Sequence, residues 1–484
     1  MAKAGDGSDQ YPQKKHATTV IALIVYAMAM CAVLFLIGLY HWEPRLSLGQ
    51  FLVGSSGILC AASALGLMVT ASLFVRYLSG TPRYDRRGVY AAIMSILIVV
   101  SAGVLSEAGL RLVAVEKHNR VFVGNLHLLP RQWRGYAEKQ QRALVYRKSA
   151  NPYFVDDDTL GWTVGSNRRS INGLYESSAE GLRSATQGEA MRDGLGDCRI
   201  ALVGDSFTFG NDVRFADTWG HRLEQWLPKG CRVLNFGVSG FGIDQMYLRY
   251  MRDVPSWKPT LVILSFIEHD LFRAMSSSGF LLFDENEFPF IKPRFVLDRE
   301  GRLDIVNRPL PKAEEIFKLG YIHNVPFIEY DRAYISAEWD RPRWWFLHRS
   351  FLARFLTSLF PLQTEGRRYV SDEEMRTLNQ ALLKAFVAAV RQDGSTPVLV
   401  YLPSGQAEIT KLPSRIPEGI QILKRANLEH VDLTGCLETV SESDRFVPSG
   451  VTGEGGHYAP PANEAIAACL AQPVLDRLQP ALVR

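Results

Sequence analysis

The stretch that decides the fold is Arg199-Ile-Ala-Leu-Val-Gly-Asp-Ser-Phe-Thr-Phe-Gly210, a short apolar run that ends in a serine-containing turn. Three later runs, 232–236, 261–266 and 397–402, share its apolar and β-branched character. Each run predicts a buried parallel strand. Helical patterns separate the runs, at 218–227, 243–254 and 372–392. Strands that alternate with helices predict an α/β domain with a doubly wound parallel sheet.

Polar residues follow the predicted strands at the points where the strands end. Ser206 follows the first strand, and the Gly-rich turn 235–245 follows the second. Ile267-Glu-His-Asp270 follows the third, and Glu454-Gly-Gly-His457 stands near the end of the chain. Ligands of open α/β sheets bind beyond the carboxyl ends of the strands, so these residues are candidates for one site.

Together these four blocks resemble the conserved blocks of the SGNH (GDSL-type) hydrolase family, over residues 196–275 and 395–475. The resemblance implies that Ser206 is the nucleophile and that His457 is the base that takes its proton. It also implies that Glu454 orients His457, although the family usually has Asp there. Asp205 and Asp270 are expected to be structural and to bond turn N–H groups.

The resemblance further implies an oxyanion hole made by the backbone N–H groups of Ser206 and Gly240 and by a side chain of the third block. The family has Asn at the position of His269. A neutral imidazole can also donate one N–H, so His269 is the candidate third donor. The substitution also leaves open a catalytically degenerate domain.

Three functions are compatible with these blocks. The first is a serine esterase that removes O-acyl groups, acetyl above all, from a cell-surface polysaccharide or similar glycan. The second is an O-acyltransferase that acts on exopolysaccharide with a membrane-protein partner. The third is a degenerate SGNH domain that binds glycan or serves as a subunit of a membrane complex.

The first 115 residues predict a membrane domain with three transmembrane helices, at about 17–41, 50–75 and 88–113. The charge-free runs 17–40, 46–75 and 88–106 hold 24, 30 and 19 residues, and about 20 apolar residues cross a bilayer. Basic residues flank these spans at positions 14–15 and 76–87. The positive-inside rule then places the N-terminus in the cytoplasm and the rest of the chain outside a bacterial inner membrane, periplasmic or extracellular.

The charge distribution supports this orientation and argues against nucleic acid as a partner. The chain has 54 Lys+Arg and 50 Asp+Glu, and residues 1–115 hold nine and five of them. The remaining 369 residues therefore carry 45 charges of each sign. The outer domain thus has no net basic charge with which to attract an anionic polymer.

The six cysteines divide between the two parts of the chain. Cys31 and Cys60 lie in the predicted spans, and four lie in the outer domain, where the compartment would be oxidising. Cys198 and Cys231 directly precede two strands that are expected to be parallel neighbours, which predicts a disulfide. We pair Cys436 with Cys469. Four buried thiols are the alternative.

Two segments outside the strand-and-helix pattern complete the predicted organisation. Residues 116–195 form a lead-in with an extended piece near 160–164, and an aromatic-rich insertion covers about 276–364 of the domain 196–484. The insertion predicts a helix that either lies on the membrane or covers the site, or else packs on the sheet. We see no metal signature, Walker loop or dinucleotide fingerprint, and we expect no cofactor.

Overall fold

In the computed structural model, the chain is described over residues 86–482, except 118–119, 284–287, 345–347, 360–370, 411–415 and 449–455, and at isolated positions before residue 86. It divides into two compact units, Met1–Trp133 with Ala337–Glu365, and Arg134–Ser336 with Gly366–Arg484. The predicted spans 17–41 and 50–75 lie almost wholly outside the described residues. Within the described part of the chain, no helix combines the length and apolarity needed to cross a membrane.

The first unit is built on helix α4 (Arg86–Val113), which covers the third predicted span. A three-stranded antiparallel sheet follows it, formed by β1 (Val115–Lys117), β2 (Arg120–Val123) and β3 (Leu126–His127). Helix α13 (Phe351–Leu359), which belongs to the predicted insertion, joins this unit.

Helix α13 packs against α4 and the small sheet. Phe355 is buried in a cluster with Leu110, Val123 and Leu128. The carboxylate of Glu107 accepts hydrogen bonds from the backbone N–H groups of Phe351 and Leu352, at 3.0 and 2.8 Å, and so caps the start of α13. Of the alternatives given for this helix, packing on the large sheet is the one that the structure contradicts, because the apolar face of α13 packs inside the first unit.

The second unit contains a seven-stranded sheet in the order β14-β13-β10-β8-β9-β7-β6. The four predicted strands are present as β8 (Arg199–Gly204), β9 (Arg232–Asn235), β10 (Leu261–Phe266) and β13 (Thr396–Tyr401), and β14 (His430–Asp432) extends them. These five strands run parallel to one another. Because β8 lies between β9 and β10, the chain changes direction across the sheet there, and this doubly wound order places a ligand site at the tips of β8 and β10.

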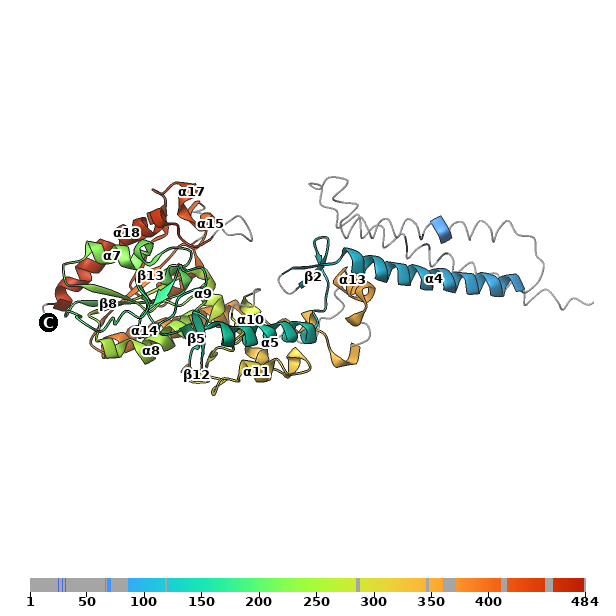
Figure 1. Ribbon diagram of the computed structural model, residues 1–484, viewed down its shortest axis with the longest axis horizontal. Coiled ribbons are helices and arrows are strands. Elements are labelled where there is room, and N and C mark those ends of the chain that lie inside the picture. The colour runs from blue at the N-terminus through green and yellow to red at the C-terminus, as the bar shows by residue number, and fades with distance from the viewer. Residues whose placement is uncertain are drawn as a thin grey trace, which may run out of the picture. The chain divides into compact units, whose positions relative to one another are not determined.

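Helices cover both faces of the parallel strands, as Figure 1 shows. Helices α7 (Trp219–Trp226) and α18 (Pro460–Leu482) pack together on one face, and α8 (Ile243–Asp253) and α14 (Asp372–Gln392) pack together on the other. The α/β prediction is therefore confirmed for this domain. The hydroxyl of Ser371 accepts the N–H of Glu374 at 3.0 Å and so caps the start of α14, while the Glu374 carboxylate pairs with Arg294.

The lead-in and the insertion add strands that the sequence did not predict. β6 (Glu176–Ser177) and β7 (Arg183–Ser184) extend the large sheet beyond β9 in antiparallel fashion. β4 (Phe154–Asp157) pairs with β5 (Gly161–Val164), which covers the extended piece expected near 160–164, and β11 (Phe295–Leu297) pairs with β12 (Leu303–Ile305). The remaining helices are α5 (Trp133–Ala150), α6 (Ser206–Phe209), α9 (Glu268–Arg273), α10 (Gly279–Leu282), α11 (Ala313–Ile316), α15 (Gln406–Thr410), α16 (Glu418–Arg425) and α17 (Glu442–Arg445). The 3₁₀ turns are Phe215–Asp217, Pro255–Trp257, Ile322–Asn324, Ile328–Tyr330, Ser336–Glu338, Pro342–Trp344 and Thr434–Leu437.

Both predicted disulfides are present. Cys198 and Cys231 are joined with a Cα–Cα distance of 4.5 Å, and the bond ties the starts of β8 and β9. Cys436 and Cys469 are joined with a Cα–Cα distance of 6.2 Å, and this bond connects the segment after β14 to α18.

Candidate active site

Ser206 lies where the sequence placed it, directly beyond the carboxyl end of β8. Asp205 directly follows β8 and caps the short helix α6, because its Oδ1 accepts the N–H of Phe207 at 2.9 Å. The hydroxyl of Ser206 donates to Asp205 Oδ2 at 3.4 Å, and the residue is 3% exposed. The turn therefore holds the serine at the sheet edge that the strand order marks as a ligand site.

His457 lies beside this turn. Its ring packs against Phe207, the residue after the serine, with ring centroids 5.0 Å apart. Both Ser206 and His457 are among the described residues, and no hydrogen bond joins them in this structure. For His457 to take the proton, the serine hydroxyl must rotate away from Asp205, a rearrangement that is common before substrate binds.

The Nδ1 atom of His457 contacts the carboxylate of Asp212, a residue that is not among the predicted site residues. Asp212 Oδ2 lies 2.7 Å from Nδ1. This hydrogen bond lowers the pKa of Asp212, although burial opposes the effect. Glu454, the carboxylate expected in this role, lies outside the described residues, so its role stays a prediction. The signal that could have found Asp212 is a carboxylate in the loop that directly follows the serine turn.

The expected oxyanion donors lie at the neighbouring strand tips. Gly240 follows β9 in a left-handed backbone conformation with φ +79°. A side chain there would be strained, and its Cβ would lie only 2.8 Å from the Phe283 ring, so the close approach requires glycine. His269 lies exposed in the first turn of α9, directly after β10. Desolvation, followed by the charge of Arg273, lowers the pKa of His269, which favours the neutral imidazole that can donate one N–H.

A buried cluster of charged residues, Arg273 with Asp205 and Asp270, stabilises the serine turn. Arg273 donates to Asp270 at 2.7 Å and lies 3.5 Å from Asp205, and both carboxyl groups are fully buried. Burial raises the pKa of Asp205. Burial, followed by the negative charge of Asp205, raises the pKa of Asp270 well above its ordinary value. Asp270 also accepts the N–H of Ile267 at 3.0 Å, so both aspartates bond turn N–H groups as expected.

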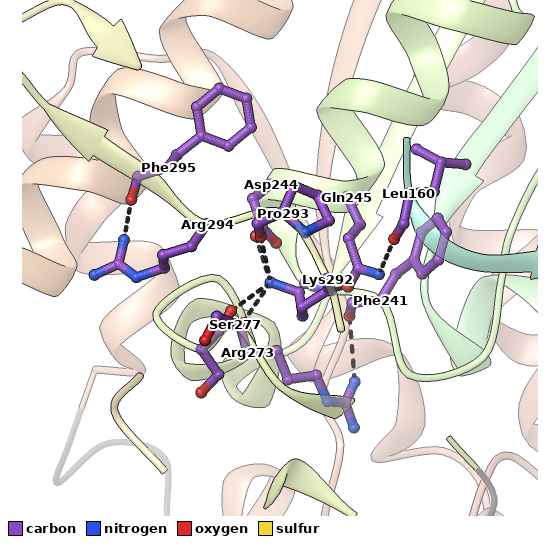
Figure 2. Close-up of polar contacts among 12 residues, drawn as sticks. Leu160, Phe241, Asp244, Gln245, Arg273, Ser277, Lys292, Pro293, Arg294 and Phe295 are labelled. Atoms are coloured by element: carbon purple, nitrogen blue, oxygen red, sulfur yellow. Dashed lines mark hydrogen bonds and ion pairs between the residues drawn. The ribbon is translucent and has the colours of Figure 1, made fainter. Parts of the chain in front are cut away.

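A second buried ion pair lies next to this cluster, and Figure 2 shows its contacts. The ammonium of Lys292, from the insertion, binds Asp244 at the start of α8, and both side chains are fully buried. The same ammonium donates to the carbonyl groups of Arg273 and Ser276, at 3.1 and 2.9 Å. Burial lowers the pKa of Lys292 and raises that of Asp244, and the ion pair opposes both shifts. The pair thus fixes the insertion to the helix that follows the Gly240 turn.

No group of three metal-ligating side chains occurs among the described residues. The arrangement at the strand tips instead offers a serine hydroxyl, an imidazole bound to a carboxylate, and N–H donors at neighbouring turns. These groups are those required for nucleophilic attack on an ester carbonyl.

Comparisons with known proteins support this chemistry. Residues 200–289 match the sequence family described as GDSL-like Lipase/Acylhydrolase. The matched segment begins in β8 and contains Ser206, Gly240 and His269. Residues 200–289 are therefore similar to the GDSL-type hydrolases. No curated protein matches the chain.

Several solved structures are similar to part of the chain at low identity. The lipase/acylhydrolase from Enterococcus faecalis is 12% identical, with 58% of this chain and 96% of that chain covered and a TM-score of 0.28. A catalytic mutant of an acetylxylan esterase from Geobacillus stearothermophilus is 15% identical, with coverages of 58% and 94% and a TM-score of 0.29. A two-domain esterase active on acetylated mannans is 11% identical, with coverages of 58% and 50% and a TM-score of 0.29. The family of the domain rests on the match over residues 200–289.

Proposed function

We propose that this protein is an extracytoplasmic serine esterase that removes acetyl groups from the hydroxyls of a cell-surface polysaccharide. The observation that carries the proposal is the position of Ser206 at the tip of β8, beside a histidine whose Nδ1 is bound to a carboxylate. A carboxylate only accepts hydrogen bonds, so Nδ1 carries the proton and Nε2 is left as the base.

The reaction would proceed in two steps. His457 takes the proton of the Ser206 hydroxyl as Oγ attacks the acyl carbonyl, and backbone N–H groups stabilise the resulting oxyanion. The bond to the sugar oxygen breaks, His457 returns the proton to that oxygen, and an acyl-serine remains. Water then attacks the acyl-serine, with His457 again as base, and the free acid leaves.

A short acyl group is favoured by the surroundings of Gly240. The half-buried ring of Phe283 lies against this glycine, and the rings of Phe288 and Trp162 pack behind it, at centroid distances of 5.0 and 6.3 Å from Phe283. We propose acetyl as the acyl group, because it is the smallest common acyl group on glycans and needs the least space beside these rings.

The extracytoplasmic location rests on the sequence and on the disulfides. Three apolar stretches with basic flanks predict membrane spans that export the domain. Two disulfides in one domain favour an oxidising compartment over the cytoplasm.

The proposal is tested by labelling the folded protein with a fluorophosphonate probe and by measuring acetate release from an acetylated polysaccharide. We expect the probe to label Ser206, and we expect Ser206→Ala to abolish both labelling and acetate release. A folded protein that does not label would contradict the enzyme function. Transfer of acetyl to an added oligosaccharide in preference to water would instead favour the acyltransferase.

A further inference from the structure

The loop that follows the nucleophile carries a carboxylate in contact with the predicted base. Asp212 Oδ2 lies 2.7 Å from His457 Nδ1, although the two residues are 245 positions apart in the chain. We propose that Asp212, rather than Glu454, is the carboxylate that positions His457. This inference rests on the proposed function, since it assigns a role within the same site.

The loop places Asp212 at a fixed position relative to the nucleophile. The backbone N–H groups of Gly210 and Asn211 both donate to the carbonyl oxygen of Ser206, at 3.0 Å each. Gly210 and Asp212 both adopt left-handed conformations, with φ of +82° and +66°. This conformation is uncommon outside glycine, but Asp tolerates it better than most residues. The hydrogen bonds from Gly210 and Asn211 to Ser206 therefore fix the loop that carries the carboxylate of Asp212.

Residues of the lead-in fix the same loop from the other side. The hydroxyl of Tyr175 accepts the backbone N–H of Asp212 at 2.9 Å. Arg183, which is 1% exposed, donates to the carbonyl of Val213 at 3.1 Å and lies over the ring of Tyr175. The strands β6 and β7 thus add a support to the site that the parallel sheet alone would not supply.

Hydrogen bonds also fix the backbone around His457. Its carbonyl accepts the N–H of Val447 at 2.8 Å, and the next residue, Tyr458, is buried and donates its hydroxyl to the carbonyl of Pro403 at 2.6 Å. The contact with Asp212 requires a proton on Nδ1, because a carboxylate only accepts hydrogen bonds. A second carboxylate would find no further N–H group at Nδ1, so only one of Asp212 and Glu454 can orient the ring through this nitrogen.

The test compares two substitutions that each remove one negative charge at nearly constant shape, Asp212→Asn and Glu454→Gln, in the full-length protein. With an aryl acetate as substrate, Asp212→Asn is expected to lower kcat by about 10³–10⁴-fold with little change in KM. Asp212→Glu should recover part of the rate, because it keeps a carboxylate. Asp193→Asn, which removes the same charge at an exposed position of the lead-in, is the matched control and should stay within about twofold of the wild type. Glu454→Gln should lower kcat less than Asp212→Asn does. The opposite pattern would overturn the proposal.

A second measurement does not depend on turnover. In ¹⁵N NMR spectra of histidine-labelled protein, the His457 signal is identified by its loss in His457→Gln. The neutral ring should carry its proton on Nδ1 in the wild type and in Glu454→Gln, and on Nε2 in Asp212→Asn. An unchanged tautomer in Asp212→Asn would overturn the assignment, even if the wild type showed no esterase activity.

The two proposals can fail separately. If the wild type does not label with a fluorophosphonate while the tautomer shifts as expected, the esterase function fails and the Asp212 assignment stands. Tyr175→Phe removes the acceptor for the Asp212 N–H and should lower kcat about tenfold, with circular dichroism as the control for folding. A rate equal to that of the wild type would show that the lead-in does not position the loop.

Discussion

The two ends of the parallel sheet are held together by different interactions. At the amino ends of the strands, a disulfide joins Cys198 and Cys231 and thereby fixes β8 to β9. At the carboxyl ends, buried charges hold the turns, with Arg273 between Asp205 and Asp270. The disulfide stabilises the amino ends without any precisely placed polar group. The turns at the carboxyl ends, in contrast, require N–H groups and carboxylates that face one site. Chemistry and stabilisation are thus separated along the strands.

Removing the nucleophile tests the carboxyl end most directly. Ser206→Ala should lower kcat by about 10⁴–10⁶-fold, because the acyl-serine can no longer form. The melting temperature should change little, since the substitution deletes one hydroxyl whose hydrogen bond to Asp205 is 3.4 Å long. Initial rates with an aryl acetate and a thermal melt check both statements. A variant that unfolds early would show that the serine is also structural.

Breaking the buried ion pair tests whether charge stabilises this end. Lys292→Met leaves the carboxylate of Asp244 buried without its cation and should destabilise the domain by about 3–5 kcal/mol. Lys424→Met, at an exposed position on α16, is the control and should change stability by no more than about 0.5 kcal/mol. Urea denaturation measures both. Equal midpoints for the two variants would contradict a stabilising role for the pair.

Removing the disulfide tests the opposite end of the sheet. Its two cysteines are 33 positions apart, and a loop of that length predicts a loss of about 4 kcal/mol in Cys198→Ser with Cys231→Ser. The rate constant kcat, measured well below the melting temperature, should remain close to that of the wild type, because Cys198 and Cys231 lie at the amino ends of β8 and β9, opposite the end that carries Ser206. A large loss of kcat with unchanged stability would show that the two ends are coupled.

Replacing the third oxyanion donor should give the smallest effect. His269→Ala should lower kcat by about 10²-fold, the lower end of the usual cost of losing one such donor. His269→Asn should keep most of the activity, because the amide also donates an N–H. If both variants match the wild type, His269 does not stabilise the oxyanion.

Much of this architecture could be predicted from local sequence. The β-branched runs that became β8, β9, β10 and β13 are buried on both faces, and a continuous apolar pattern is sufficient to identify such strands. Ser206 was found because it directly follows one of them. The strands β6 and β7 have two residues each, which is too short for any periodic signal, so the antiparallel extension of the sheet could not be predicted.

The insertion shows a different limit. Its helix α13 has an apolar face, and the sequence indicates that such a face must be buried. The sequence does not indicate which surface buries the apolar face of α13, since any apolar surface of suitable shape would lower the free energy of the folded protein. In the structure, Leu110 of α4 and Val123 of β2 form that surface.

The sequence by itself determined the α/β architecture and the strand that presents Ser206, because both depend on patterns within a segment, and it predicted the Cys198–Cys231 pair from the adjacency of two strands. Only the tertiary structure decided which carboxylate binds His457. That choice depends on the distance between side chains far apart in the chain, and distance is set by how α18 and the loop after α6 pack, with Asp212 reaching His457 at 2.7 Å.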